Sequence, residues 1–240
     1  MKIFIIRHAE SDNNKNWHFD RNDTNRSNDP AISDLGQKQA DCLTAFLQDH
    51  LEEFDFTRIY ISPFLRTLQT AAVFHHLYDV PKVVWKPIHE NGGCVETGIE
   101  TGEWRGVSGM GRSEIRAKFP HFEVSDEIGE EGWWNRPIPE PLNERDSRAN
   151  QVITKLTQNF GTTNEHIALV SHGGFHHNII NALIGVNNPN DSYRYWFEVQ
   201  NTGITCFVYG NERDNGFNPD EWRIDYVNRH EWLPKELRRN

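Results

Sequence analysis

Cysteine, positive charge and long apolar runs are all scarce in this chain of 240 residues. The three cysteines (Cys42, Cys94 and Cys206) are scattered and form no C-x-x-C pair, so neither a disulfide framework nor a thiolate zinc site is indicated. The net charge of −10 argues against general nucleic-acid binding, which needs a basic face. No apolar run is long enough for a signal-peptide core or a membrane span. We therefore expect a cytoplasmic protein with no nucleic-acid or membrane partner.

Two short apolar runs each end in residues that can bind an anion. Residues 3–6 run into Arg7 and His8, and residues 166–171 run into His172. Such runs are typical of interior strands of a parallel sheet, whose ligands gather at the carboxyl ends of the strands. Because neighbours on a strand point to opposite faces, Arg7 and His8 can face one pocket only if the chain leaves strand geometry between them. The pattern indicates an anion site built around imidazole.

The order of the predicted elements favours an α/β fold. Strands, helices and strands alternate over the first 85 residues or so, which is typical of a parallel sheet with crossover helices. The polar residues 12–30 are interpreted as a long loop, and the Gly- and Pro-rich residues 86–140 as an inserted lobe over the sheet. We predict one domain over residues 1–240, a three-layer α/β/α sandwich with a mainly parallel sheet. The expected strands are 2–6, 58–61, 82–85, 166–171, 196–199, 203–209 and 222–227. One expected helix begins at residues 33–36, and the others span about 64–78, 113–119, 143–160 and 174–184.

Four motifs carry a specific resemblance. Residues 7–14 read R-H-A-E-S-x-x-N, residues 35–40 read L-G-x-x-Q-A, residues 62–71 read S-P-x-x-R-T-x-Q-T-A, and residues 171–174 read S-H-G-G. In this order they resemble the signature segments of the histidine phosphatase superfamily, the phosphoglycerate mutase-like proteins. The resemblance implies the fold of that family and a phosphatase that acts through a phosphohistidine.

The resemblance also assigns roles to residues of this chain. His8 is expected to be the nucleophile, and phosphoryl transfer to it needs fixed positive charge around the phosphate oxygens. Arginine suits this task because its planar fork pairs two oxygens at once, and the same cations should keep the His8 ring unprotonated. The expected catalytic residues are His8, Arg7, Arg66, His172 and an acid. The expected phosphate-binding residues are Arg7, Asn14, Arg66, His172 and Gly173.

The acid that protonates the leaving alcohol follows the third strand in this family. Here Glu90, in Ile88-His89-Glu90, is the preferred candidate, and Glu96, Glu100 and Glu103 lie close by. Trp104-Arg105-Gly106 is similar to a W-E-G segment of the family but carries Arg in place of Glu. The acid is thus assigned to Glu90, with its three neighbours as alternatives.

Hydrolysis is favoured over phosphoryl shuttling. The mutases of the family carry a paired-arginine segment in the lobe, which is missing here, so a second anion clamp is not expected. The predicted function is a phosphomonoesterase for a small phosphorylated metabolite, with no cofactor. His172 and His176 have the i, i+4 spacing of a helical metal site, but no carboxylate motif accompanies them, and no metal is predicted. A mutase, a phosphatase specific for a sugar or nucleotide precursor, a silent binding module and a metal-dependent hydrolase remain the alternatives.

Overall fold

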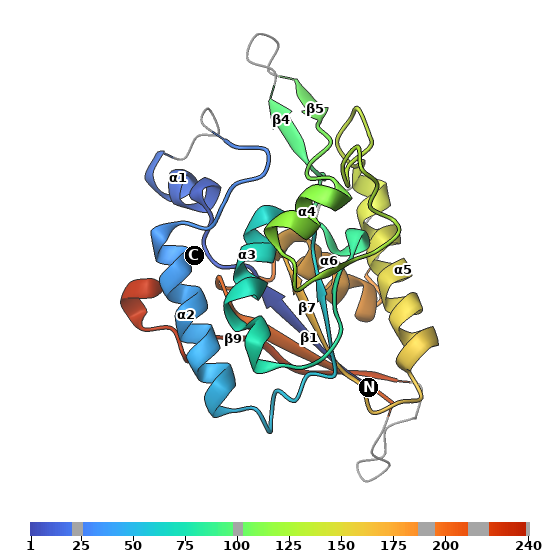
Figure 1. Cartoon of the computed structure of the whole chain (residues 1–240). Helices are drawn as coiled ribbons and strands as arrows, with labels where there is room; N and C mark the ends of the chain where they lie inside the picture. Colours follow the sequence, from blue (N-terminus) through green and yellow to red (C-terminus); the bar gives the residue numbers. More distant parts are fainter. Residues whose placement is uncertain (21–25, 98–102, 187–194, 211–220, 239–240) are drawn as a thin grey trace.

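A seven-stranded sheet forms the centre of the molecule, a computed structural model that describes residues 1–20, 26–97, 103–186, 195–210 and 221–238 (Figure 1). The strand order is β6-β3-β2-β7-β1-β8-β9. Its strands are β1 (Lys2–Arg7), β2 (Arg58–Ile61), β3 (Lys82–Val84), β6 (Glu123–Val124), β7 (His166–Ser171), β8 (Ile204–Tyr209) and β9 (Trp222–Arg229). The strands from β6 to β1 pair in parallel, whereas β8 and β9 are antiparallel. The predicted mainly parallel sheet is confirmed.

The side chains of β1 alternate between the two faces of the sheet. Phe4 and Ile6 belong to one buried cluster, together with residues of α2 (Asp34–Asp49), α3 (Leu65–Phe74) and α4 (Arg112–Lys118). Ile3 and Ile5 belong to a second cluster, together with residues of α5 (Leu142–Phe160) and α6 (Gly173–Leu183). Helices therefore cover both faces, and the predicted three-layer α/β fold is confirmed. None of the described helices has an apolar stretch long enough to cross a bilayer.

The segment 12–30 was expected to be a loop, and this prediction is wrong for its first part. Residues Asp12–Asp20 form the helix α1. A reciprocal pair starts this helix: the Oγ of Ser11 accepts from the Asn14 amide, and the Oδ1 of Asn14 accepts from the Ser11 amide. Such a pair satisfies amide groups that the first turn leaves unbonded. The helix has no apolar stripe, which is why periodicity did not indicate it.

The predicted strand at 196–199 is also wrong. This stretch is irregular, and it packs against α6 instead of joining the sheet. The ring of Trp196 stacks on His177 with centroids 4.3 Å apart, and the amide of Phe197 donates to the Nδ1 of His177. Side chains thus satisfy backbone groups that a strand would pair with its neighbour, while Val199 is buried, Phe197 is half-buried and Trp196 stays exposed.

The region 86–140 contains three strands that the sequence did not indicate. The strands β4 (Val95–Thr97) and β5 (Trp104–Gly106) form a separate two-stranded sheet, and β6 extends the edge of the main sheet beside β3. In Figure 1 this β4–β5 pair lies at the same end of the molecule as α1. Trp133 and Ile128 pack in the same buried cluster as α3, so the region is continuous with the core on that face.

Candidate active site

The strand β1 ends at Arg7, and His8 is the first residue after it. The His8 amide donates to the carbonyl of Ser171 at 2.9 Å, at the end of β7, and the Nδ2 of Asn201 donates to the His8 carbonyl at 2.9 Å. Arg7 and His8 consequently line one cavity of about 300 Å³. Its walls are formed by Arg7, His8, Ser11, Asn13, Asn14, Arg26, Pro30, Arg66 and Glu90.

The His8 ring is fixed in one tautomer. Its Nδ1 lies 2.7 Å from the Ala9 carbonyl, which can only accept, so Nδ1 carries the proton. The Nε2 therefore keeps its lone pair, and it accepts from the Nε of Arg66 at 3.2 Å. Burial, followed by the charges of Arg66 and Arg7, holds the pKa of His8 well below its usual 6.5. The ring is thus neutral, and its lone pair is turned toward a cation.

Two arginines stand beside this nitrogen. Arg7 donates through Nη1 to the carbonyl of Val199, and its buried Nε has no hydrogen-bond partner among the described residues. Burial lowers the pKa of Arg66 to about 10, while Glu90 and Asp29 oppose this effect. Both guanidinium groups remain charged at neutral pH. They offer the donors that a phosphate at His8 requires.

His172 lies behind His8, and its ring is fully buried. The two ring centroids are 5.2 Å apart, and the Nε2 of His172 lies 2.7 Å from the Oγ of Ser62. The Nδ1 of His172 has no partner among the described residues. Neither His172 nor Gly173 is among the residues that line the cavity, although a Cβ on Gly173 would lie 3.4 Å from the Nε of Arg7. The structure thus brings both residues close to the cavity, with His172 packed behind His8.

Glu90 is the candidate acid that lines the cavity. The amides of Gly174 and Phe175, at the start of α6, donate to its carboxylate at 3.3 and 3.1 Å. A Cβ on Gly174 would lie 2.4 Å from the Oε1 of Glu90, so glycine is needed there for this approach. The carboxyl group of Glu90 thus lies at the amino end of α6, where these two backbone amides donate to it.

The alternative acids are placed differently. Glu96 lies on β4, where its carboxylate pairs with Arg105 of β5 at 2.5 Å. Glu103 precedes β5 and is exposed. Glu100 lies outside the described residues. Neither Glu96 nor Glu103 lines the cavity that holds His8.

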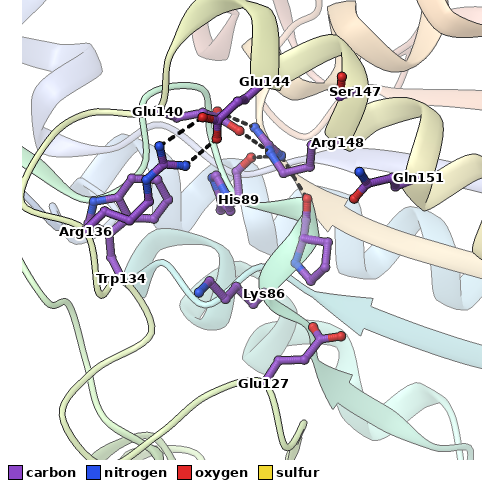
Figure 2. A pocket seen from close by; sticks show the side chains of 11 residues that line it. Lys86, His89, Glu127, Trp134, Arg136, Glu140, Glu144, Ser147, Arg148 and Gln151 are labelled. Atoms are coloured by element: carbon purple, nitrogen blue, oxygen red, sulfur yellow. Dashed lines mark hydrogen bonds and ion pairs between the residues drawn. The ribbon is translucent and has the colours of Figure 1, made fainter.

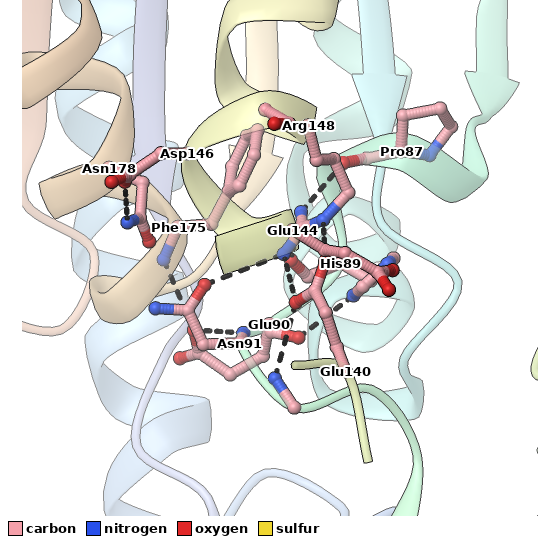
Figure 3. A network of polar contacts seen from close by, with 12 residues as sticks. Pro87, His89, Glu90, Asn91, Glu140, Glu144, Asp146, Arg148, Phe175 and Asn178 are labelled. Atoms are coloured by element: carbon pink, nitrogen blue, oxygen red, sulfur yellow. Dashed lines mark hydrogen bonds and ion pairs between the residues drawn. The ribbon is translucent and has the colours of Figure 1, made fainter. Parts of the chain in front are cut away.

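A buried ion pair holds the loop that carries Glu90 (Figure 3). Arg148 of α5 pairs with Glu140 at 2.6 Å, with side chains that are only 11% and 3% exposed. The same guanidinium donates to the carbonyls of Pro87 and His89 at 2.8 and 2.9 Å. These contacts fix the backbone on the N-terminal side of Glu90. Sequence reasoning missed them, because no local pattern links residue 148 to residue 90.

Arg148 and Glu140 also line a second cavity of about 420 Å³, on the α5 side of the Glu90 loop (Figure 2). Arg136, Glu144 and Lys86 are further charged residues of its wall, and Arg136 pairs with Glu144. Each guanidinium of this cavity is thus paired with a carboxylate. In the cavity at His8, by contrast, three arginines face one glutamate.

Asn14, which is predicted to contact the phosphate, lines the cavity from α1, and its Oδ1 is engaged with Ser11. Two further residues of that wall, Asn13 and Arg26, were missed by sequence reasoning. Their position within the predicted loop gave no signal of their role. Among the residues that the structure describes, no three His, Cys, Asp or Glu side chains cluster so as to hold a metal ion.

Comparison with protein families gives one match, the histidine phosphatase superfamily (branch 1), over residues 3–222. The chain belongs to the histidine phosphatase superfamily. The resemblance of the four motifs is thereby confirmed, and with it the prediction of an enzyme of the phosphatase type. The comparison with curated protein sequences gave no match.

Solved structures of histidine phosphatases share the fold. A phosphoserine phosphatase from Entamoeba histolytica, bound to phosphoserine, is 20% identical with a TM-score of 0.56, over 97% of this chain and 99% of that one. A mycobacterial glucosyl-3-phosphoglycerate phosphatase is 18% identical with a TM-score of 0.58, over 95% and 99%. A putative α-ribazole-5'-P phosphatase from Escherichia coli is 16% identical with a TM-score of 0.59, over 96% of this chain and 98% of that one. The shared fold extends over nearly the whole length of each chain.

Proposed function

We propose that this protein is a metal-independent phosphomonoesterase that acts through a phosphohistidine on His8. The observation that carries the proposal is the His8 ring, with Nδ1 bonded to a carbonyl and the Nε2 lone pair facing the Arg66 guanidinium in an open cavity. A phosphate there would lie between that nucleophile and the donors of Arg7 and Arg66. These groups would stabilise the charge on the equatorial oxygens during transfer.

Two chemical steps follow from this arrangement. In the first, Nε2 attacks phosphorus, the ester P–O bond breaks, and Glu90 gives a proton to the departing alkoxide. In the second, Glu90 takes a proton from water, the water oxygen attacks phosphorus, and the P–N bond breaks to release phosphate and neutral His8. Arg7, Arg66, Asn14, His172 and Gly173 are proposed to hold the phosphate or the groups that contact it.

The class of substrate is a small phosphorylated metabolite. The cavity of about 300 Å³ is at the lower end of the range of about 300–1,000 Å³ for ligand sites. The similar solved structures include proteins named for phosphoserine, glucosyl-3-phosphoglycerate and α-ribazole phosphate, which are all small monoesters. A small monoester is therefore proposed here too.

The test is phosphate release from a panel of monoesters, in the presence of a chelator, for the wild type and His8→Ala. Turnover that survives the chelator and is lost by at least about 10⁴-fold in the variant is expected, because the nucleophile is removed. Turnover that the chelator abolishes would favour a metal-dependent hydrolase. Absence of turnover on every ester, together with phosphoryl exchange between phosphoglycerates, would favour a mutase, and absence of both would favour a binding module.

A further inference from the structure

The guanidinium of Arg148 uses every donor that it has (Figure 3). Its Nε and Nη2 donate to the two carboxylate oxygens of Glu140 at 2.6 and 2.8 Å. Its Nη1 donates to the carbonyls of Pro87 and His89, and its Nη2 also donates to the Oδ1 of Asn91 at 3.4 Å. The five N–H groups of an arginine point outward in a fixed planar fork, and each of them is engaged here. A lysine, with three donors on one nitrogen, cannot make this set of contacts.

Glu140 holds the other side of the same loop. Its amide donates to the Gly92 carbonyl at 2.9 Å, and its Oε2 accepts from the Gly92 amide at 3.4 Å. Arg148 contacts the residues on either side of Glu90, whereas Glu140 contacts the loop two residues beyond it. The backbone around Glu90 is thus tied to one buried ion pair, which we call the Arg148–Glu140 clamp.

The clamp also contacts the segment that holds the Glu90 carboxylate. The Cζ of Arg148 lies over the ring of Phe175, 4.7 Å from its centroid, and the amide of the same Phe175 donates to the Oε1 of Glu90. Two supports therefore define where this carboxylate lies, because the clamp holds the loop and the start of α6 holds the carboxyl group. His8 is held separately, by the Ser171 carbonyl at the end of β7. A loop that shifts would consequently move Glu90 relative to His8.

We propose that Arg148 and Glu140 are positioning residues for the acid, which hold the Glu90 carboxyl group where it can protonate the leaving oxygen of the ester. Proton transfer requires an acid within hydrogen-bond reach of that oxygen, and a displacement of about 1 Å can lower a rate by about 10²-fold. A good leaving group such as nitrophenolate needs little of this protonation. The clamp should therefore matter for alkyl phosphates and much less for nitrophenyl phosphate. The inference rests on the proposed function and adds residues to its acid step.

The test is the ratio of kcat/KM on nitrophenyl phosphate to kcat/KM on the alkyl phosphate that the wild type hydrolyses fastest. Arg148→Lys keeps the charge and loses the planar fork, so we expect this ratio to rise by roughly 10- to 100-fold. Glu140→Gln keeps the shape and weakens the ion pair, and the ratio should rise by about 5- to 10-fold. A partly unfolded variant loses activity equally on both esters, so a role in folding alone leaves the ratio unchanged. If Arg148→Lys does not fold, the ratio for Glu140→Gln decides.

A double-mutant cycle with Glu90→Gln shows whether the clamp acts through the acid. The acid is already removed in Glu90→Gln, so the addition of Arg148→Lys should change the ratio by less than about 2-fold. A further rise as large as that in Arg148→Lys alone would overturn the inference, since the clamp would then act on the leaving group by another route.

Arg136→Lys is the matched control. Arg136 lines the same second cavity as Arg148 but pairs with Glu144, outside the loop that carries Glu90, and this variant should keep the wild-type ratio. A ratio that Glu90→Gln raises but both clamp variants leave unchanged would overturn the inference and leave the proposed function intact. Failure of the proposed function looks different, because every ester would then be inert, His8→Ala would be active, or Glu90→Gln itself would leave the ratio unchanged.

Discussion

The cavity at His8 has an inner wall of Arg7, His8 and Arg66 and an outer wall of Asn13, Asn14 and Arg26, and the two walls are built in different ways. The inner wall comes from the ends of β1 and the start of α3, and its backbone is tied to β7 and to Asn201. The outer wall comes from α1 and the segment after it, and its side chains are half-buried or exposed. The difference teaches that the residues proposed for the chemistry lie at the centre of the sheet, whereas the polar segments around it supply the part of the cavity where sequence motifs gave no signal.

Among the variants, Arg66→Lys in the inner wall should cause the largest loss of activity. Lysine keeps the charge but loses the planar fork and the Nε donor that faces the His8 Nε2 at 3.2 Å. We expect kcat/KM with nitrophenyl phosphate to fall by about 10²- to 10³-fold. Steady-state kinetics measure this, with circular dichroism to show that the variant is folded. A loss of less than 5-fold in a folded variant would remove Arg66 from the proposed mechanism.

Glu90→Gln should have an effect that depends on the leaving group. An alkyl phosphate needs a proton on its departing oxygen, whereas nitrophenolate needs little. We expect kcat/KM, which reports the phosphoryl transfer to His8 and not the later hydrolysis, to fall by about 10²- to 10³-fold on the alkyl ester and by less than about 10-fold on nitrophenyl phosphate. The measurement is the ratio of the two losses. Equal losses on both esters would mean that Glu90 is not the acid, and Glu96→Gln and Glu103→Gln would be compared next.

The buried pair behind Glu90 can be compared with an exposed pair on the same helix. Arg148 pairs with Glu140 in the interior, whereas Arg136 pairs with Glu144 where both side chains are 34–45% exposed. Arg148→Met leaves Glu140 and two carbonyls without their donor, so the free energy of unfolding should fall by about 3 kcal/mol. Arg136→Met should cost less than about 1 kcal/mol. Urea unfolding measures the free energy of unfolding of both variants. Equal losses would contradict the expected difference between the buried and the exposed pair.

The smallest expected effect concerns His176 and the dependence of the free energy of unfolding on pH. Burial, followed by the charge of Arg7, lowers its pKa to about 3, from an unfolded value near 6.5. As the pH falls from 6.5 toward 3, the unfolded chain therefore binds a proton that the folded protein does not. The free energy of unfolding should fall by up to about 1.4 kcal/mol per pH unit from this residue alone.

His176→Leu should make that slope shallower. Neither ring nitrogen of His176 has a hydrogen-bond partner among the described residues, so an apolar replacement leaves no group newly unpaired. Urea unfolding between pH 6 and pH 4.5 measures the slope, and the exposed His50, changed to Gln, is the control. A slope that His176→Leu leaves unchanged would show that the ring is protonated in the folded state.

Much of the fold was predictable because its core elements are short and strongly patterned. The continuous apolar run of β1 is typical of a buried strand, and the apolar residues of α2 recur with the period of a helix. The helix α1 was not predictable in this way, since its nine residues lack an apolar stripe and depend on the Ser11–Asn14 pair. The strand prediction for residues 196–199 was wrong for the opposite reason: the residues are apolar enough for a strand, but they contact His177 of α6 and do not pair with the sheet.

The candidate site was predictable where it follows the motifs. Arg7, His8 and Arg66 lie together in the structure, with His172 behind them, as the four segments indicated. Glu90 is predicted as the acid from its place soon after the third strand, and the structure places its carboxylate in the cavity, held by the start of α6. Arg26 and Arg148 could not be predicted, since their roles depend on contacts between segments far apart in the sequence.

The phosphohistidine is the central claim, and trapping it is the most direct test. Wild type and Glu90→Gln are mixed with a ³²P-labelled nitrophenyl ester, quenched in alkali during turnover and digested to peptides. We expect an acid-labile, alkali-stable label on the peptide with His8, close to one per chain in Glu90→Gln, where hydrolysis is slowed. His8→Ala should carry none. A label on any other residue, or sustained phosphate release with no label in either protein, would contradict the account.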